Sequence, residues 1–238
     1  MSIWRRLAAA TTDASIGSQI GALLGGGGMR DGGNRHKMPQ ATDNEVPFTV
    51  GVIMLGAKMA KADGSVTSDE VTAFKQAFNV SPAEMKHAAP VFNLAKRDAS
   101  GYEACARQLA VAFKGDRNLL EDVIDGLFHI AKADDEVHPQ EAEFLREVAN
   151  VFGLTNDEFN LIKARHIAAA KRNPYDVLGV EPSISDADLE RHYRAMMADN
   201  HPDKLVARGV PNEFVAIATE KAAALSDAYD AILKERSA

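Results

Sequence analysis

The stretch His201-Pro202-Asp203-Lys204 stands between two segments with helical periodicity, and this arrangement indicates the architecture of the C-terminal part of the chain. The segment before it, 186–200, carries apolar residues at helical spacing, and a second helical pattern covers roughly 212–235. A short apolar element, 174–180, lies upstream. The sequence therefore predicts a short helix, a long helix, a loop at the His-Pro-Asp tripeptide, and another long helix.

The two long segments each contain an apolar stripe with a recurrence of three to four positions, as expected for the core-facing side of a helix. The stripes are Leu189, Tyr193, Met196 and Met197 in the first segment, and Ala218, Ala222, Leu225, Tyr229 and Ile232 in the second. Tyr175, Val177 and Leu178 of the short element would close the core. We expect an antiparallel three-helix unit of about 60 residues, near the lower size limit for a domain that folds alone.

Charged residues beside the tripeptide determine what it can bind. Arg191 and Arg194 lie three positions apart and therefore share one face of their helix. Pro202 stiffens the turn, and Asp203 can accept hydrogen bonds or pair with an arginine of a partner. Between positions 186 and 204, however, acids at 186, 188, 190, 199 and 203 outnumber bases at 191, 194 and 204. The basic face is small, so the electrostatic part of any docking is expected to be weak or tuned to one partner.

The order of elements over residues 174–236 resembles the J-domain of DnaJ-type co-chaperones. The resemblance implies a site that binds a DnaK-type chaperone, formed by His201, Pro202, Asp203, Arg191, Arg194 and Lys204. It also implies that the chain stimulates ATP hydrolysis by that partner and is not itself an enzyme. The alternatives for the tripeptide are a turn without a partner and an acid–base pair of His201 with Asp203, which lacks a nucleophile or third group beside it.

An internal repeat precedes this unit. Residues 61–66 and Glu70 align with residues 132–137 and Glu141 at one constant offset, and each copy has an apolar helical pattern on both sides. The repeated unit is thus a helix, an acidic turn and a helix. In the second copy Pro139, with Glu141 behind it, favours a helix start. Two such units predict a helical bundle, with further helices between 81 and 114.

The repeat resembles the TerB-like domain, named from tellurite-resistance proteins, over residues 47–170. A TerB-like region followed by a C-terminal J-domain is similar to the DjlA-type co-chaperones of Gram-negative bacteria, and residues 201–209 and 221–229 extend that match. The resemblance implies an all-α fold in three parts: a glycine-rich segment and linker (1–46), a TerB-like helical domain (47–172) and a J-domain (173–238). It also implies that the TerB-like domain provides specificity by binding a client, a partner or a second copy of itself.

The acidic turns support a second hypothesis. Asp63, Glu70, Asp134 and Glu141 are weak candidates for metal ligands, because a twelve-residue calcium loop with oxygens at alternate positions is absent. Capping of helix starts is the plainer interpretation of these residues. The competing function is a stress-response protein that binds a metal or small ligand and carries the J-like unit as an accessory. A third is a structural adaptor whose J-like unit has lost activity.

The composition of the chain argues against several other classes of function. The formal net charge of −7 argues against a nucleic-acid partner, and a single cysteine, Cys105, excludes an internal disulfide and is expected to be buried. No phosphate-binding loop is present, so we expect no cofactor. The DjlA-type family usually begins with a transmembrane helix, but the uncharged stretch 14–29 is glycine-rich and shorter than the roughly 20 apolar residues that span a bilayer. We therefore expect a cytoplasmic protein, with contact between the N-terminal segment and a membrane surface left open.

Overall fold

A computed structural model of the chain describes residues 45–62, 102–113, 116–132, 137–167, 171–208, 210 and 215–237. These residues form the helices α3 (Glu45–Ala62), α6 (Tyr102–Ala112), α7 (Arg117–Ala131), α8 (Pro139–Val151), α9 (Asn156–His166), α10 (Pro174–Leu178), α11 (Asp186–Asp199), α12 (Pro202–Arg208) and α13 (Val215–Arg236). No strand occurs among them. The prediction of an all-α fold is confirmed.

Capping residues fix where the bundle helices begin. At α8, Pro139 occupies the first turn, and the Glu141 carboxylate accepts a hydrogen bond from the His138 N–H at 2.9 Å. At α9, the Thr155 hydroxyl accepts from the Glu158 N–H at 3.3 Å, while the Glu158 carboxylate accepts from the Thr155 N–H at 2.7 Å. Both arrangements are capping boxes, which satisfy amides that the helix itself leaves without partners.

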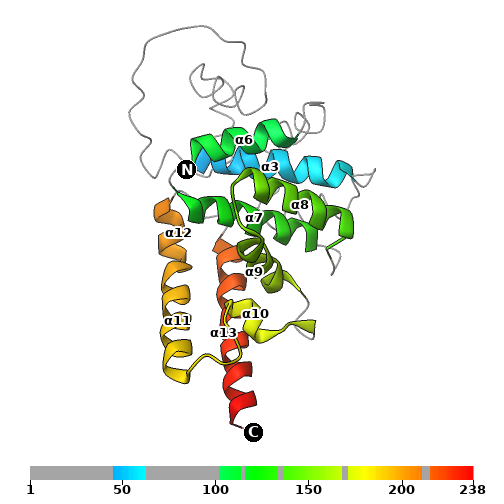
Figure 1. Cartoon of the computed structure of the whole chain (residues 1–238). Helices are drawn as coiled ribbons and strands as arrows, with labels where there is room; N and C mark the ends of the chain where they lie inside the picture. The colour runs from blue at the N-terminus through cyan, green and yellow to red at the C-terminus, as the bar shows by residue number, and fades with distance from the viewer. Residues whose placement is uncertain are drawn as a thin grey trace, which may run out of the picture.

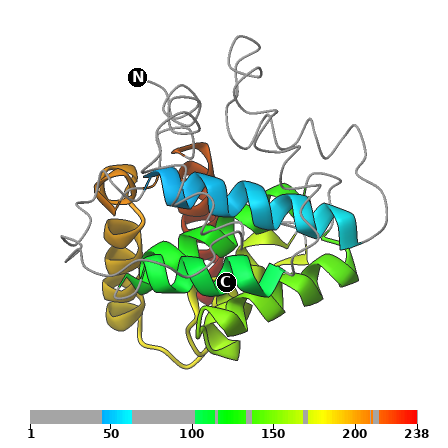
Figure 2. The same cartoon turned by 90° about the horizontal axis from the view of Figure 1, so that it is seen from above.

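The first helices pack into a bundle around an aromatic and aliphatic core. Helix α3 lies against α6 and α7, and α8 packs on α6 and α7 (Figures 1 and 2). The largest fully buried side chains are Phe48, Phe128, Phe159, Ile53, Met54, Leu55, Met59 and Leu109. A Cβ at Gly51 would stand 2.5 Å from the methyl carbons of Leu109, so the close approach of α3 to α6 requires glycine there. Cys105 is buried in the same core, as predicted.

The last four helices form the predicted three-helix unit with one addition. Helices α11 and α12 stack as a column that runs antiparallel to α13, and α10 packs along α13 (Figure 1). Most of the core predicted from periodicity is confirmed: Tyr175, Val177, Leu178, Leu189, Leu225 and Ile232 are buried together, with Tyr193, Met196, Met197 and Tyr229 partly buried at its edge. Ala222 of the predicted stripe is half-buried. The rings of Tyr193 and Tyr229 stack at 4.3 Å, which joins α11 to α13.

The structure differs from the predicted loop at the tripeptide, because Pro202 is the first residue of the short helix α12. The His201 carbonyl accepts hydrogen bonds from the N–H groups of Lys204 (2.9 Å) and Leu205 (3.2 Å). Proline suits a first helical position, since its φ is fixed near the helical value and it has no N–H to leave unpaired. The tripeptide is therefore a helix start rather than an open loop.

A second difference concerns Ala218, which the stripe of the last helix assigns to the surface that faces α11. In the structure Ala218 packs instead into the core of the bundle, together with Leu205, Val210 and Ile217. In the opposite direction, Ala164 of α9 packs into the core of the three-helix unit. The bundle and the three-helix unit thus each contribute a side chain to the other's hydrophobic core.

Several sequence predictions fall outside the described residues: those on the glycine-rich segment 1–44 and those on Asp63, Glu70 and Asp134. The described part of the chain contains no helix of sufficient length and hydrophobicity to cross a membrane.

Candidate functional site

His201 and Asp203 project from the junction of α11 and α12, with 59% and 92% of their side-chain surface exposed. Helix α11 ends at Asp199 and is capped by Asn200, whose backbone N–H and side-chain amide both donate to the Met196 carbonyl, at 3.0 and 2.8 Å. The Nδ1 atom of His201 then accepts from the Asp203 N–H at 3.2 Å. Since Nδ1 accepts, the proton of a neutral ring lies on Nε2, which can donate to another molecule. The backbone thus holds an exposed ring donor and an exposed carboxylate side by side.

The predicted basic residues are exposed too, but each is paired with an acid three to five positions before it in the sequence. Arg191 bonds to Asp188, the Nη2 atom of Arg194 lies 2.5 Å from Glu190 Oε1, and Lys204 Nζ lies 2.8 Å from Asp199 Oδ1. The side chains of Arg191 and Arg194 are 74% and 76% exposed. Exposed pairs of this kind contribute only about 0–1 kcal/mol. The cations can therefore exchange these acids for carboxylates of a partner at small cost.

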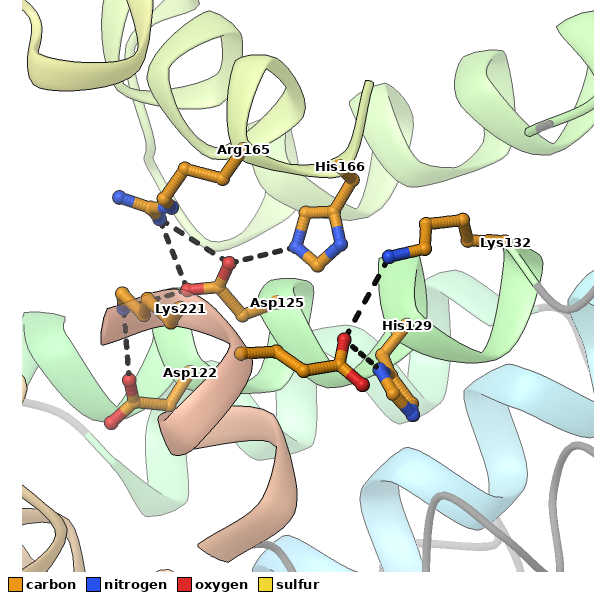
Figure 3. Close-up of polar contacts among 8 residues, drawn as sticks. Asp122, Asp125, His129, Lys132, Arg165, His166 and Lys221 are labelled. Carbon is orange, nitrogen blue, oxygen red and sulfur yellow. Dashed lines mark hydrogen bonds and ion pairs between the residues drawn. The ribbon is translucent and has the colours of Figure 1, made fainter. Parts of the chain in front are cut away.

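A buried network of charges, which the sequence did not predict, lies where α7, α9 and α13 meet (Figure 3). Asp125 is at its centre. Its carboxylate accepts from Arg165 Nη2 at 3.0 and 3.3 Å and from His166 Nε2 at 3.0 Å, and Lys221 Nζ stands 2.7 Å away. Lys221 Nζ also lies 3.5 Å from Asp122 Oδ1. The side chains of Asp122, Asp125, Arg165 and Lys221 are all at most 7% exposed, so two carboxylates and two cations balance one another away from solvent.

The pKa shifts within the network follow from burial and charge. Burial alone would raise the pKa of the Asp125 carboxyl, but the charges of Arg165 and Lys221 and the hydrogen bond from His166 outweigh it and hold this pKa well below its ordinary value. Burial lowers the pKa of His166 more than Asp125 raises it. His166 is therefore neutral at pH 7, and its contact with Asp125 is a hydrogen bond, not an ion pair. Its ring stacks on Phe128, with centroids 5.1 Å apart.

A small cavity borders this network. It has a volume of about 30 Å³ and is lined by Lys132, Arg172 and Glu220 in addition to residues of the network. That space suits a water molecule or two. It is far below the several hundred Å³ of an ordinary small-molecule pocket.

The sequence contained one local signal for the network. Asp122 and Asp125 lie one turn apart in a segment, 119–131, whose other residues are apolar or glycine except Glu121 and His129. Carboxylates at such positions are rarely buried without a cation. No local pattern names that cation, because Arg165 lies 40 positions from Asp125, and Lys221 lies 99 positions from Asp122.

Of the weak metal-ligand candidates, Glu141 is the one that falls within the described residues. It is buried, and its carboxylate belongs to the capping box of α8, in agreement with the plainer interpretation. The described ranges hold no group of three or more His, Cys, Asp or Glu side chains that could bind a metal ion.

Comparisons with known proteins match both parts of the chain. The family described as tellurite resistance protein TerB matches residues 49–164, and the DnaJ domain family matches residues 173–237. Neither match extends over the other, and together they cover every residue of the tripeptide site and of the buried network except Arg165 and His166. No solved structure gives a significant match.

Three related proteins are similar to this chain over most of its length. The co-chaperone protein DjlA of Vibrio cholerae is 26% identical over 231 residues, which cover 83% of this chain and 81% of the relative. The DjlA of Photobacterium profundum is 28% identical over 215 residues (79% and 77%), and that of Escherichia coli is 25% identical over 261 residues (93% and 96%). The helix order and the His-Pro-Asp start of α12 agree with these matches. The relatives belong to a family of co-chaperones, not of enzymes. Together the observations identify the chain as a DjlA-like J-domain co-chaperone, in which a TerB domain precedes the J-domain.

Proposed function

We propose that this chain recruits a DnaK-type chaperone through His201, Pro202 and Asp203 and stimulates its ATP hydrolysis. A J-domain co-chaperone implies a DnaK-type partner. The observation that supports the role of these residues is the exposure of His201 and Asp203 at a helix start whose backbone is already hydrogen-bonded. A group held in one conformation before binding loses little entropy when it docks.

The neighbouring cations would complete the docking face. We propose that Arg191, Arg194 and Lys204 bind carboxylates of the chaperone, while Asp203 accepts hydrogen bonds from one of its arginines. The three cations must first leave Asp188, Glu190 and Asp199. We also propose a role for the bundle, which matches the TerB family: it would provide specificity by binding a client protein, a partner or a second copy of this chain.

The direct test is a single-turnover assay of ATP hydrolysis by a purified DnaK-type chaperone with increasing concentrations of the full chain. We expect stimulation by the wild type and its loss in His201→Gln and Asp203→Asn. Asp230→Asn, an exposed carboxylate on α13 with the same change in charge, is the matched control and should stimulate normally.

Two further results decide the outcome. Thermal unfolding of the variants should match the wild type, because both side chains are exposed and surface substitutions usually change stability by less than about 0.5 kcal/mol. A wild-type chain that gives no stimulation at micromolar concentration would refute the proposal, even if it binds the chaperone.

A further inference from the structure

The segment that follows the tripeptide is anchored in the TerB-like bundle. Leu205 and Val210 are 5% and 2% exposed and belong to the bundle core, and the Val210 N–H donates to the Leu205 carbonyl at 3.0 Å. A cavity of about 10 Å³ is lined by both of them and by Phe48 of α3. Helix α12 is therefore held by the bundle from one side, while His201 and Asp203 at its start face solvent.

The beginning of α13 is anchored beside it. Ile217 and Ala218 pack into the same core. Lys221, one turn further, lines the same small cavity as Leu205 and reaches the carboxylates of α7. Helices α12 and α13 thus contact the bundle through one continuous interface, in which buried apolar side chains lie next to a buried ion pair.

The buried charges at this interface are complementary between the bundle and the J-domain. The bundle supplies two buried carboxylates, Asp122 and Asp125, and one strongly basic partner within the network, Arg165. The second cation comes from the J-domain as Lys221. A buried lysine is rare without a partner, and loss of one member of a buried pair leaves an uncompensated charge. The pairing therefore penalises other orientations of the J-domain on the bundle.

We propose that Lys221 is a positioning residue, which fixes the J-domain on the TerB-like bundle so that the bundle holds the His201-Pro202-Asp203 turn ready to dock. The apolar anchors Leu205 and Val210 share this task. The inference rests on the proposed function, and it gives the bundle a role in chaperone docking in addition to the selection of clients.

The expected signature differs from that of the docking residues themselves. When the turn is in its docking-competent conformation for only a fraction of the time, the apparent affinity falls by that fraction, while the fully bound state is unchanged. Lys221→Met should therefore raise the concentration for half-maximal ATPase stimulation, by about ten-fold if one molecule in ten is competent. Maximal stimulation should persist, whereas His201→Gln and Asp203→Asn should abolish it.

The experiment uses the full chain as wild type, Lys221→Met and Lys221→Arg. The matched control is Lys234→Met, an exposed lysine on the same helix. Lys221→Arg keeps the charge and should recover most of the affinity. Amide hydrogen exchange provides a second readout without the chaperone, because the N–H groups of Lys204, Leu205 and Val210 bond within the anchored segment. Their exchange should be at least several-fold faster in Lys221→Met than in the control.

The outcomes separate the two ideas. If wild type does not stimulate the ATPase, the proposed docking function fails, and the exchange rates still test the anchor. If wild type stimulates and a folded Lys221→Met has the control's half-maximal concentration and exchange rates, the positioning role is refuted. Should Lys221→Met not fold, Val210→Ala replaces it, since truncation of one buried side chain weakens the same anchor without an uncompensated charge.

Discussion

Replacement of Asp125 by asparagine tests whether the buried network of charges stabilises the contact between the TerB-like bundle and the J-domain, as its geometry indicates. The substitution keeps the size of the side chain and one acceptor oxygen but removes its charge. Among the fully buried side chains, Asp122 is then the carboxylate left to Arg165 and Lys221, and His166, which is neutral at pH 7, adds no charge. The variant therefore buries one positive charge in excess.

The size of the effect follows from that excess. Breaking a buried ion pair costs about 3–5 kcal/mol, since an uncompensated charge remains behind. The retained acceptor oxygen favours the lower end, so we expect a loss of about 3 kcal/mol in the free energy of unfolding. For a chain of this size that corresponds to a fall of about 6–12 °C in the melting temperature.

The assay is urea and thermal denaturation of the full chain, with Asp230→Asn as the control for the same change in charge at an exposed position. A double variant sharpens the test. Addition of Lys221→Met to Asp125→Asn removes the excess cation, so the combined loss should be smaller than the two separate losses added together, by about 0.5–3 kcal/mol. Additive losses, or an Asp125→Asn melting temperature equal to that of the control, would show that no coupled buried network exists.

Three further predictions concern other parts of the structure. Glu190→Gln releases Arg194 from an exposed pair worth about 0.2–1 kcal/mol, so the concentration for half-maximal ATPase stimulation should fall by up to roughly five-fold at low salt; Glu235→Gln, exposed on α13, is the control and should change nothing. The pKa of His166 lies below its ordinary 6.5 in the folded chain, so the unfolded chain takes up the proton first and stability falls as the pH drops below about 6.5. His166→Gln should flatten that fall between pH 7 and 5 in urea titrations, and an unchanged pH slope would contradict the assignment. Glu141→Ala removes the capping box of α8 and should lower the free energy of unfolding by about 1 kcal/mol, which a melting curve can detect.

Hydrophobic periodicity predicted the elements whose partners are close in sequence. The stripe around Leu189 and the one around Leu225 both lie in the core of the three-helix unit, since helical spacing specifies which side chains share a face. The same spacing could not specify the neighbour. Ala218 belongs to the predicted stripe, yet it packs into the bundle, because the stripe is long enough to serve two surfaces in succession.

The helix start at Pro202 and the buried network were missed for different physical reasons. Helix α12 has seven residues, too few for a period of 3.6 to be recognised, and the proline that begins it is also typical of loops. The network depends on side chains that only the tertiary fold brings together. The sequence around Asp125 does not indicate that its partner is a cation 40 positions away.

The candidate docking residues were predicted almost entirely through family resemblance. The structure adds that each cation among them is engaged by a neighbouring acid, as Arg194 is by Glu190. The acid count had indicated a small basic face. It could not indicate pairing, because exposed side chains choose partners by rotamer as well as by spacing.

The apolar junction between the bundle and the J-domain has a consequence for dissection of the protein. A cut near residue 172 respects the boundary between the two matched families, but it removes Leu205, Val210, Ile217 and Ala218 from the bundle core in one step. Each fragment would then present freshly uncovered apolar surface, a feature that promotes aggregation. Grafting this J-domain onto another co-chaperone meets the same difficulty, because the recipient needs a matching apolar surface and two carboxylates for Lys221. The unit that can be exchanged between proteins is therefore the J-domain together with the helices on which it rests.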